Sequence, residues 1–361
     1  MRRLLFVALW LVFVFLLLQL AGFVFYRLEV SKPISGYGYP AGLEQPHPAL
    51  GYHYAPNFSG FFKGTAYQDV AIRTNAQGFR DSDFAPRPNE GRRIAVLGDS
   101  VVFGPGVRQD ERFTECLDGI ALADGTRARF LNLGVHAYSL GHYLALAREN
   151  FLGADPDALL LGITLNDFQP MDSVGPARRM RRRAEEAHKP HWIARLQERL
   201  GRTYAARFIA EIDTRLRYAL LNTNEREDYH TAWMRSVVDA WEQEANRARF
   251  QARLEDLTTL AAKRALPLGV VLFPELNDLR APEVFGGPRK QVRAILDARR
   301  LPYCDPYDDF AASPDVAALF LTRDSVHYTP AGHQALCDAI KRCLDSGPLQ
   351  GFPPNRSTGT H

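Results

Sequence analysis

Short apolar runs that alternate with helical patterns constrain the fold of this 361-residue chain more than any other feature. From Arg92 onward, runs such as RIAVLG, ARFLNLG, ALLLGI and LGVVLF are separated by stretches with helical periodicity, the last of which ends near Leu344. Strands separated by helices of this length form βαβ units, in which the strands are parallel. We therefore predict an α/β domain with three α/β/α layers and a parallel sheet over residues 92–344.

The remainder of the chain lacks this alternation. Residues 29–91 are rich in Gly, Pro, Tyr and Asn, which predicts a strap of short strands and turns leading to the main domain. Residues 176–263 show successive charged helical patterns without a strand, so we expect a helical insertion there, either beside the domain or as a cap. Residues 345–361 are rich in Gly, Pro, Ser and Thr and are expected to be a disordered tail.

The N-terminal segment, residues 1–28, is expected to be a transmembrane signal anchor. Residues 4–26 carry no charge and are long enough to cross a bilayer, which takes about 20 residues. Arg2 and Arg3 precede the segment while only Arg27 follows closely, so the positive-inside bias places the rest of the chain across the membrane. A cleaved signal peptide is the alternative, although the run exceeds the usual apolar region of about 7 to 15 residues.

Charge and cysteine content bound the partners and the compartment. The net charge of +3 gives no reason to expect nucleic acid as a partner. Residues 176–207 hold ten basic and three acidic residues, which indicates a solvated helical face or a surface for anionic lipid headgroups. Cys337 and Cys343 lie about 240° apart on a helix and should not pair. A disulfide from Cys304 to one of them and four free buried thiols, including that of Cys116, both stay open.

Polar residues follow the apolar strands at one edge of the expected sheet. The first strand ends in Gly98-Asp99-Ser100, the second in Gly134 and the third in Asn166-Asp167, while Asp324 precedes His327 by three residues before the last helix. The carboxyl ends of parallel strands meet at the edge where open α/β sheets bind ligands. A serine nucleophile needs a base, an acid that orients the base, and donors for the oxyanion. Together these residues predict acyl transfer by a serine.

The blocks GDSVVFG, NLGVHAYS, LND and DSVHYT resemble, in order and spacing, the successive blocks of the SGNH/GDSL hydrolase superfamily. The upstream pieces GYHYAPN and TNAQGFRD also resemble segments of membrane-anchored bacterial members. The resemblance covers residues 92 to about 344. It implies a flavodoxin-like SGNH hydrolase fold, a single-pass protein of the bacterial inner membrane, and a catalytic domain in the periplasm or outside the cell.

The resemblance also implies roles for individual residues. Ser100 is the expected nucleophile, His327 the general base and Asp324 the residue that orients the base. The expected oxyanion donors are the backbone N–H groups of Ser100 and Gly134 and the side-chain amide of Asn166.

Other residues near this set have expectations of their own. Thr164 stands where the third block usually has Gly, which puts the local turn in question. Asp99 and Asp167 are possible supporting residues that could equally hold the loops by hydrogen bonds. Arg80 is expected to fix the strap to the domain. Val102 stands two residues after Ser100, so the G-x-S-x-G motif of α/β-hydrolases is absent.

The expected function is a serine-dependent esterase acting on the acyl ester of a small molecule, lipid or glycan, with no metal or organic cofactor. An O-acyltransferase acting on a cell-surface glycan uses the same residues and stays an alternative. A catalytically silent glycan-binding subunit of an envelope assembly system is the second alternative. The expected partners are the acyl ester and the membrane, which residues 4–26 contact, while the sequence leaves protein partners unknown.

Overall fold

A five-stranded sheet lies at the centre of the molecule, and all its neighbouring strands are parallel. Its order β6-β5-β7-β8-β9 is flavodoxin-like and confirms the predicted α/β class. The strands are β5 (Arg92–Gly98), β6 (Ala128–Gly134), β7 (Ala158–Ile163), β8 (Leu268–Leu272) and β9 (Tyr303–Cys304). The computed structural model describes residues 2–27, 39–40, 42–62, 70–84, 91–178, 203–205, 208–209, 212, 229–321 and 324–353.

Helices cover both faces of this sheet, because successive strand residues point to opposite sides. Ile94 and Val96 of β5 pack into one apolar cluster, and Ala95 and Leu97 pack into the other. The first cluster includes residues of α3 (Phe113–Leu117), α13 (Tyr307–Ala311) and α14 (Pro330–Asp345). The second includes residues of α4 (Leu140–Arg148), α9 (Glu244–Lys263) and α12 (Gly287–Ala298).

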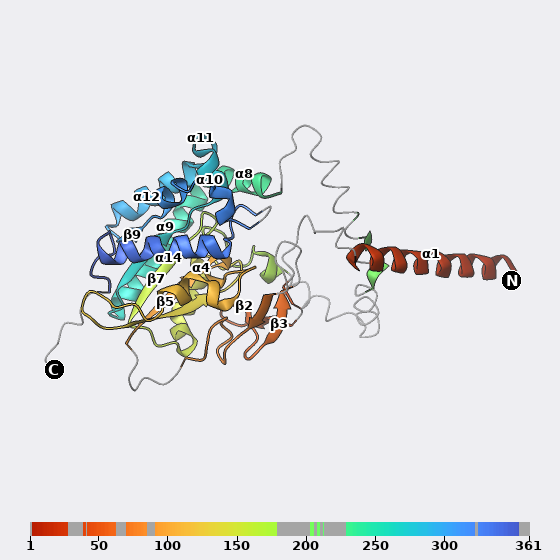
Figure 1. Cartoon of the computed structure of the whole chain (residues 1–361), viewed down its shortest axis with the longest axis horizontal. Coiled ribbons are helices and arrows are strands. Elements are labelled where there is room, and N and C mark those ends of the chain that lie inside the picture. Colours follow the sequence, from red (N-terminus) through yellow and green to blue (C-terminus); the bar gives the residue numbers. More distant parts are fainter. Residues whose placement is uncertain are drawn as a thin grey trace.

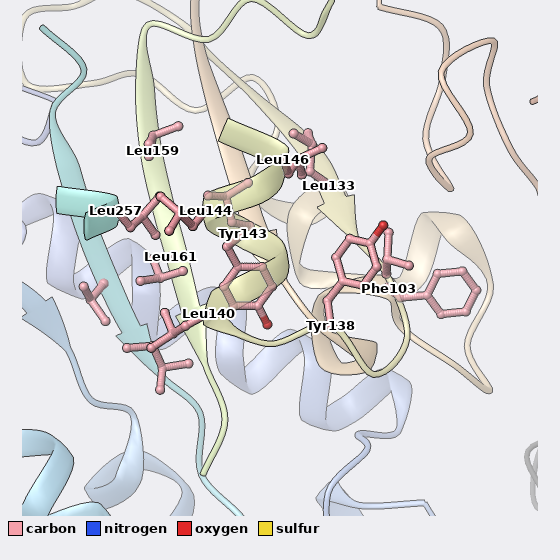
Figure 2. Packing of buried hydrophobic residues seen from close by; sticks show 14 of the residues in the cluster. Phe103, Leu133, Tyr138, Leu140, Tyr143, Leu144, Leu146, Leu159, Leu161 and Leu257 are labelled. Carbon is pink, nitrogen blue, oxygen red and sulfur yellow. The ribbon is translucent and has the colours of Figure 1, made fainter. Parts of the chain in front are cut away.

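Helix α4 illustrates how the layers are held together. Figure 2 shows Tyr143 and Leu144 of α4 among Leu159 and Leu161 of β7 and Leu257 of α9. All five side chains are buried. Truncating a buried leucine to alanine typically costs about 2–5 kcal/mol of unfolding free energy, so the packing of α4 against β7 and α9 contributes substantially to the stability of the fold.

The expected insertion over residues 176–263 is too long by at least one helix. Helix α9 was assigned to it, yet Phe250, Leu254 and Leu257 of α9 are buried in the core. Parallel strands need a crossover, and α9 provides it between β7 and β8. The preceding α8 (Tyr229–Glu242) buries Trp241 in the same core. Residues 179–202, and with them most of the basic cluster, lie outside the described residues.

The expected strap of short strands contains two antiparallel hairpins in its described part. Strand β1 (Glu44–His47) pairs with β2 (Gly51–Tyr54), and β3 (Ser59–Phe62) pairs with β4 (Val70–Arg73). Leu50, Tyr52 and Phe79 are fully buried in the cluster that also holds α4. The strap is therefore packed into the same core as the α/β domain.

Helix α1 (Arg2–Arg27) extends away from the α/β domain (Figure 1). Its segment Leu5–Val24 has a mean hydropathy of 2.6, and only 6% of the most apolar window is buried. Exposure of this kind is not that of a core helix of a soluble domain. The segment is long and apolar enough to cross a membrane, and a signal sequence would have the same properties.

The four cysteines form two disulfides, Cys116–Cys337 and Cys304–Cys343, so the alternative of four free thiols is wrong. The pairing Cys304–Cys343 was one of the open alternatives, and Cys337 and Cys343 do not pair with each other. Both disulfides end on α14, which they connect to α3 and to β9. The pairing of Cys116 could not be derived from the sequence because its partner is 221 residues away.

Removing the disulfides is expected to destabilise the fold unequally. The double variant Cys116→Ser/Cys337→Ser should lose about 2–5 kcal/mol of unfolding free energy, and Cys304→Ser/Cys343→Ser should lose less. A disulfide that closes a longer loop constrains the unfolded chain more, and the two sequence separations are 221 and 39. Urea denaturation of both variants in detergent, followed by tryptophan fluorescence, measures the difference. A larger loss for the shorter loop would contradict this expectation.

The tail expected to be disordered is folded up to residue 353. Leu349 and Phe352 are buried and pack against Gly269 of β8, where a side chain would meet them at 3.1 to 3.4 Å. Residues 354–361 lie outside the described part. The remaining short elements are α2 (Ser100–Phe103), α10 (Leu276–Arg280), α11 (Pro282–Phe285) and the 3-10 turns Gln109–Glu111, Asn150–Gly153 and Val316–Leu319.

Candidate active site

Ser100, His327 and Asp324 meet at the carboxyl edge of the sheet. Ser100 begins α2 directly after β5, while Asp324 and His327 lie in the loop before α14. The Nε2 atom of His327 lies 2.7 Å from Ser100 Oγ, and its Nδ1 atom lies 2.7 Å from Asp324 Oδ2. The three residues are only 6%, 4% and 3% exposed. Two residues 227 positions apart in the sequence are thus joined in a hydrogen-bonded Ser–His–Asp chain.

Asp324 holds both the backbone and the imidazole of its loop. Its Oδ1 atom accepts the backbone N–H groups of Val326 and His327 at 2.9 and 3.0 Å, which closes a tight turn. Its Oδ2 atom accepts from Nδ1 of His327, which leaves Nε2 to accept the Ser100 proton. Asp324 is not an N-cap, because Thr329 caps α14 by accepting the N–H of Gly332.

The turn into α2 places Ser100 at a point of close packing. A Cβ atom on Gly98 would lie 2.2 Å from the Val102 side chain, so glycine is needed there. Asp99 accepts the N–H of Val101 at 2.9 Å and fixes the first turn of α2. The first N–H groups of a helix lack acceptors within it, so the Ser100 N–H is suited to stabilise negative charge.

The turn that carries Asn166 forms in spite of Thr164. The N–H of Thr164 donates to Asp167 Oδ2 at 3.1 Å, and the N–H of Asp167 donates to the Thr164 carbonyl at 3.2 Å. The Thr164 hydroxyl lies 2.7 Å from Asn166 Oδ1. This contact directs the oxygen of the Asn166 amide toward Thr164, so its Nδ2 group points away from Thr164.

Gly134 has a packing role that the sequence analysis weighed only as a turn. A Cβ atom there would lie 2.3 Å from the backbone nitrogen of Phe103 in α2. Its N–H donates to the side-chain oxygen of Asn132 at 3.0 Å. A role of this N–H as an oxyanion donor stays a prediction, and it would require the Gly134 N–H to leave Asn132.

The two possible supporting acids, Asp99 and Asp167, are both buried in hydrogen-bond networks. Asp167 accepts the hydroxyl of Tyr143 at 3.1 Å in addition to the N–H of Thr164. Burial raises the pKa of Asp99, and burial together with the nearby Asp99 raises that of Asp167 well above its ordinary value. Both side chains hold the turns on which Ser100 and Asn166 lie.

The sequence matches no model of a known protein family and no curated protein. Among solved structures, the chain is similar to the acetylxylan esterase Axe2 of Geobacillus stearothermophilus, with 18% identity over 71% of this chain and 95% of Axe2 and a TM-score of 0.39. It is also similar to a lipase/acylhydrolase of Enterococcus faecalis (14% identity, 70% and 94% coverage, TM-score 0.36). A third similar structure is LAE5, an alpha/beta hydrolase from the metagenome of Lake Arreo in Spain. It has 15% identity over 71% of this chain and 98% of LAE5, with a TM-score of 0.40.

Two residues outside the sequence motifs hold the Asn166 turn from opposite sides. Glu275, three residues after the end of β8, accepts the N–H of Leu165 at 3.2 Å, and Trp241 of α8 donates to the Leu165 carbonyl at 2.6 Å. Burial raises the pKa of Glu275 to about 8. The place of Glu275 at the end of a strand was a signal in the sequence that could have identified it. The sequence around Trp241 contained no such signal.

The strap supports the other end of α2, as expected for Arg80. This buried guanidinium donates to the carbonyls of Phe103 and Val107 at 3.2 and 2.7 Å and also to that of Gly104. Arg112 in turn donates to the Arg80 carbonyl at 2.6 Å. The last carbonyl groups of a helix have no N–H donor within the helix, and Arg80 supplies donors to them at the end of α2. Its hydrogen bonds make it part of the scaffold that holds α2, the helix that begins with Ser100.

Strap tyrosines also hold the loop that follows β6. The hydroxyl of Tyr54 accepts the N–H of His136 at 2.8 Å, and the hydroxyl of Tyr52 donates to the His136 carbonyl. The hydroxyl of Tyr138 donates back to the Tyr52 carbonyl at 2.9 Å. Strand β2 is thus hydrogen-bonded to the loop next to Gly134.

Proposed function

We propose that this protein is a serine-dependent esterase of the SGNH/GDSL type. The observation that carries the proposal is the chain of two 2.7 Å contacts from Ser100 through His327 to Asp324. A serine hydroxyl is a weak nucleophile unless a base accepts its proton, and the base works in one tautomer only when an acid holds its other nitrogen. Both conditions are met in a buried site at the edge of the sheet where α/β proteins bind ligands.

The proposed reaction follows from this geometry. Ser100 Oγ attacks the ester carbonyl carbon while its proton passes to His327 Nε2, and Asp324 stabilises the resulting imidazolium. The Ser100 N–H and the Asn166 amide donate to the oxyanion. The carbon–oxygen bond to the alcohol then breaks, His327 returns its proton to the leaving oxygen, and an acyl-enzyme remains. Water then gives a proton to His327 and attacks the acyl carbon, the bond from this carbon to Ser100 Oγ breaks, and His327 returns the proton to Ser100 Oγ as the acid leaves.

We place the catalytic domain in the periplasm or outside the cell. Helix α1 has the length and hydropathy of a membrane span, and Arg2 and Arg3 precede it. Two disulfides in one domain are typical of proteins that fold in an oxidising compartment. Protease treatment of spheroplasts, with permeabilised spheroplasts as the control, tests this placement. The domain should be cut before permeabilisation, and full protection until the inner membrane is permeabilised would contradict the placement.

Active-site labelling tests the proposed chemistry. The full-length protein in detergent should take up one fluorophosphonate per chain, detected by intact mass, and Ser100→Ala should take up none. Ser325→Ala is the matched control, because Ser325 is buried beside the triad and its hydroxyl has no hydrogen-bond partner among the described residues. Absence of label on folded wild-type protein would reject the esterase and favour a silent glycan-binding subunit.

Hydrolysis and transfer share every residue named here, so a second assay separates them. A p-nitrophenyl acyl ester is turned over with and without an added oligosaccharide acceptor, and the acyl group is followed to water or sugar. We expect free acid as the main product. Acyl sugar as the main product would replace the esterase by an O-acyltransferase.

A further inference from the structure

The hydroxyl of Thr164 contacts two acceptor atoms but carries one hydrogen. Its Oγ1 atom lies 2.7 Å from Asn166 Oδ1 and 3.1 Å from Asp99 Oδ2. Thr164 and Asp99 are 1% and 3% exposed, so bulk water does not reach them to satisfy the spare contact. Three oxygen atoms in a row need two hydrogens between them, and the threonine supplies only one.

A proton on Asp99 resolves this arrangement. With the proton on Oδ2, Asp99 donates to Thr164 Oγ1, and Thr164 donates to Asn166 Oδ1. The Oδ1 atom of Asp99 remains free to accept the N–H of Val101, as it does at 2.9 Å. In this state the Asn166 amide is fixed with its oxygen toward Thr164, and its Nδ2 group is left to donate elsewhere, as the proposed oxyanion role requires.

An ionised Asp99 gives the opposite arrangement. The carboxylate then takes the Thr164 hydrogen, and the Asn166 amide has to rotate by about 180° to donate from Nδ2 to Thr164 Oγ1, because an amide offers a donor on one side and an acceptor on the other. Its oxygen would occupy the place of the donor. An acceptor in that place repels an oxyanion instead of stabilising it.

We propose that Thr164 is a positioning residue that sets the orientation of the Asn166 amide, and that the proton on Asp99 selects the orientation able to bind an oxyanion. This inference rests on the proposed esterase function. It assigns a use to the threonine that replaces the glycine of the third sequence block. The two buried acids also differ in their contacts: Asp99 Oδ2 lies against Thr164 Oγ1, whereas Asp167 accepts the Tyr143 hydroxyl and the Thr164 N–H.

The surroundings of Asp99 favour its protonated form. Burial raises the pKa of Asp99, while a positive charge on His327 and the hydrogen bonds from Val101 and Thr164 lower it. The acids Asp167 and Glu275 and the phenols Tyr143 and Tyr328 also face it electrostatically. Because the pKa is raised and the proton is required, activity should fall as the pH rises through the Asp99 pKa.

Variants of Thr164 test the relay by the steady-state kinetics of p-nitrophenyl acetate hydrolysis. Thr164→Val keeps the shape and removes the hydroxyl, and we expect kcat to fall about 10- to 100-fold with KM little changed, since the loss of a whole oxyanion donor typically costs about 10²–10³. Thr164→Ser retains the hydroxyl and should restore kcat to within a few-fold of the wild type. Thermal unfolding of each variant shows whether folding is preserved.

A double-mutant cycle with Asn166→Ala separates positioning from general support. If Thr164 acts through Asn166, Thr164→Val costs almost nothing once the amide is absent. Asp99→Asn supplies a permanent donor to Thr164, and its kcat/KM should lack the alkaline decline of the wild type. The inference is overturned if Thr164→Val keeps the wild-type kcat, if it costs as much without Asn166, or if Asp99→Asn retains the decline.

The proposed function and this inference fail in different ways. Wild-type protein that neither hydrolyses the ester nor reacts with fluorophosphonate would reject the esterase and the relay with it. Wild-type protein that does both, together with an unaffected Thr164→Val, would leave the esterase standing and reject the relay alone.

Discussion

Alanine at either Ser100 or His327 is expected to lower kcat for ester hydrolysis by about 10⁴ to 10⁶, and alanine at both positions by no more than the larger single loss. Ser100 Oγ and His327 Nε2 lie 2.7 Å apart and act on one proton, so neither works without the other. The activity that remains would come from substrate binding and the oxyanion donors. Steady-state kinetics of the three variants with one p-nitrophenyl ester measures the expected non-additivity.

The comparison needs a serine that is equally buried but has no part in the reaction. Ser325→Ala meets this need and should keep kcat within about twofold of the wild type, since it loses no hydrogen bond formed by its hydroxyl to the described residues. Independent losses that multiply in the double variant would show that the two residues do not act as one unit, and the catalytic assignment would fall.

Asp324→Asn is expected to lower kcat by about 10⁴ while the fold is kept. An asparagine oxygen can still accept the N–H groups of Val326 and His327, so the turn survives. The Nδ2 group would then face His327 Nδ1, which now lies 2.7 Å from Asp324 Oδ2. A donor in that place forces the imidazole into the tautomer whose Nε2 carries a hydrogen and cannot accept one from Ser100.

A matched change at a distant acid serves as the control for Asp324. Asp315 also accepts backbone N–H groups, those of Ala317 and Ala318, but from an exposed 3-10 turn. Asp315→Asn should therefore leave kcat unchanged within about twofold. A loss below tenfold in Asp324→Asn, with unfolding at the wild-type temperature, would mean that this acid does not set the tautomer.

The sheet and the meeting of Ser100, His327 and Asp324 could be predicted because their signals are local. Strands β5, β6, β7 and β8 are largely apolar runs of five to seven residues, and Ser100 and Asp324 lie in short blocks with characteristic neighbours. Parallel topology then brings the strand ends to one edge without further information. The prediction needed no knowledge of which side chains touch.

The features that were missed depend on contacts between distant residues. Helix α9 looks like its charged neighbours in sequence, and only its burial against α4 shows that it belongs to the core. Leu349 and Phe352 lie among Gly and Pro residues, yet Gly269 leaves room for them. The contact of Thr164 with Asp99 likewise joins two loops 65 residues apart.

The hydrogen bonds of the strap extend the structural unit around Ser100 beyond the α/β domain. Arg80 supports the end of the helix that starts with Ser100, and Tyr52 and Tyr54 support the loop beside Gly134. A soluble version of the protein cut at residue 91 would lose these contacts along with the membrane segment. The strap residues Tyr52, Tyr54 and Arg80 therefore belong to the structural unit that holds Ser100, and truncation, secretion and domain-fusion experiments have to preserve them.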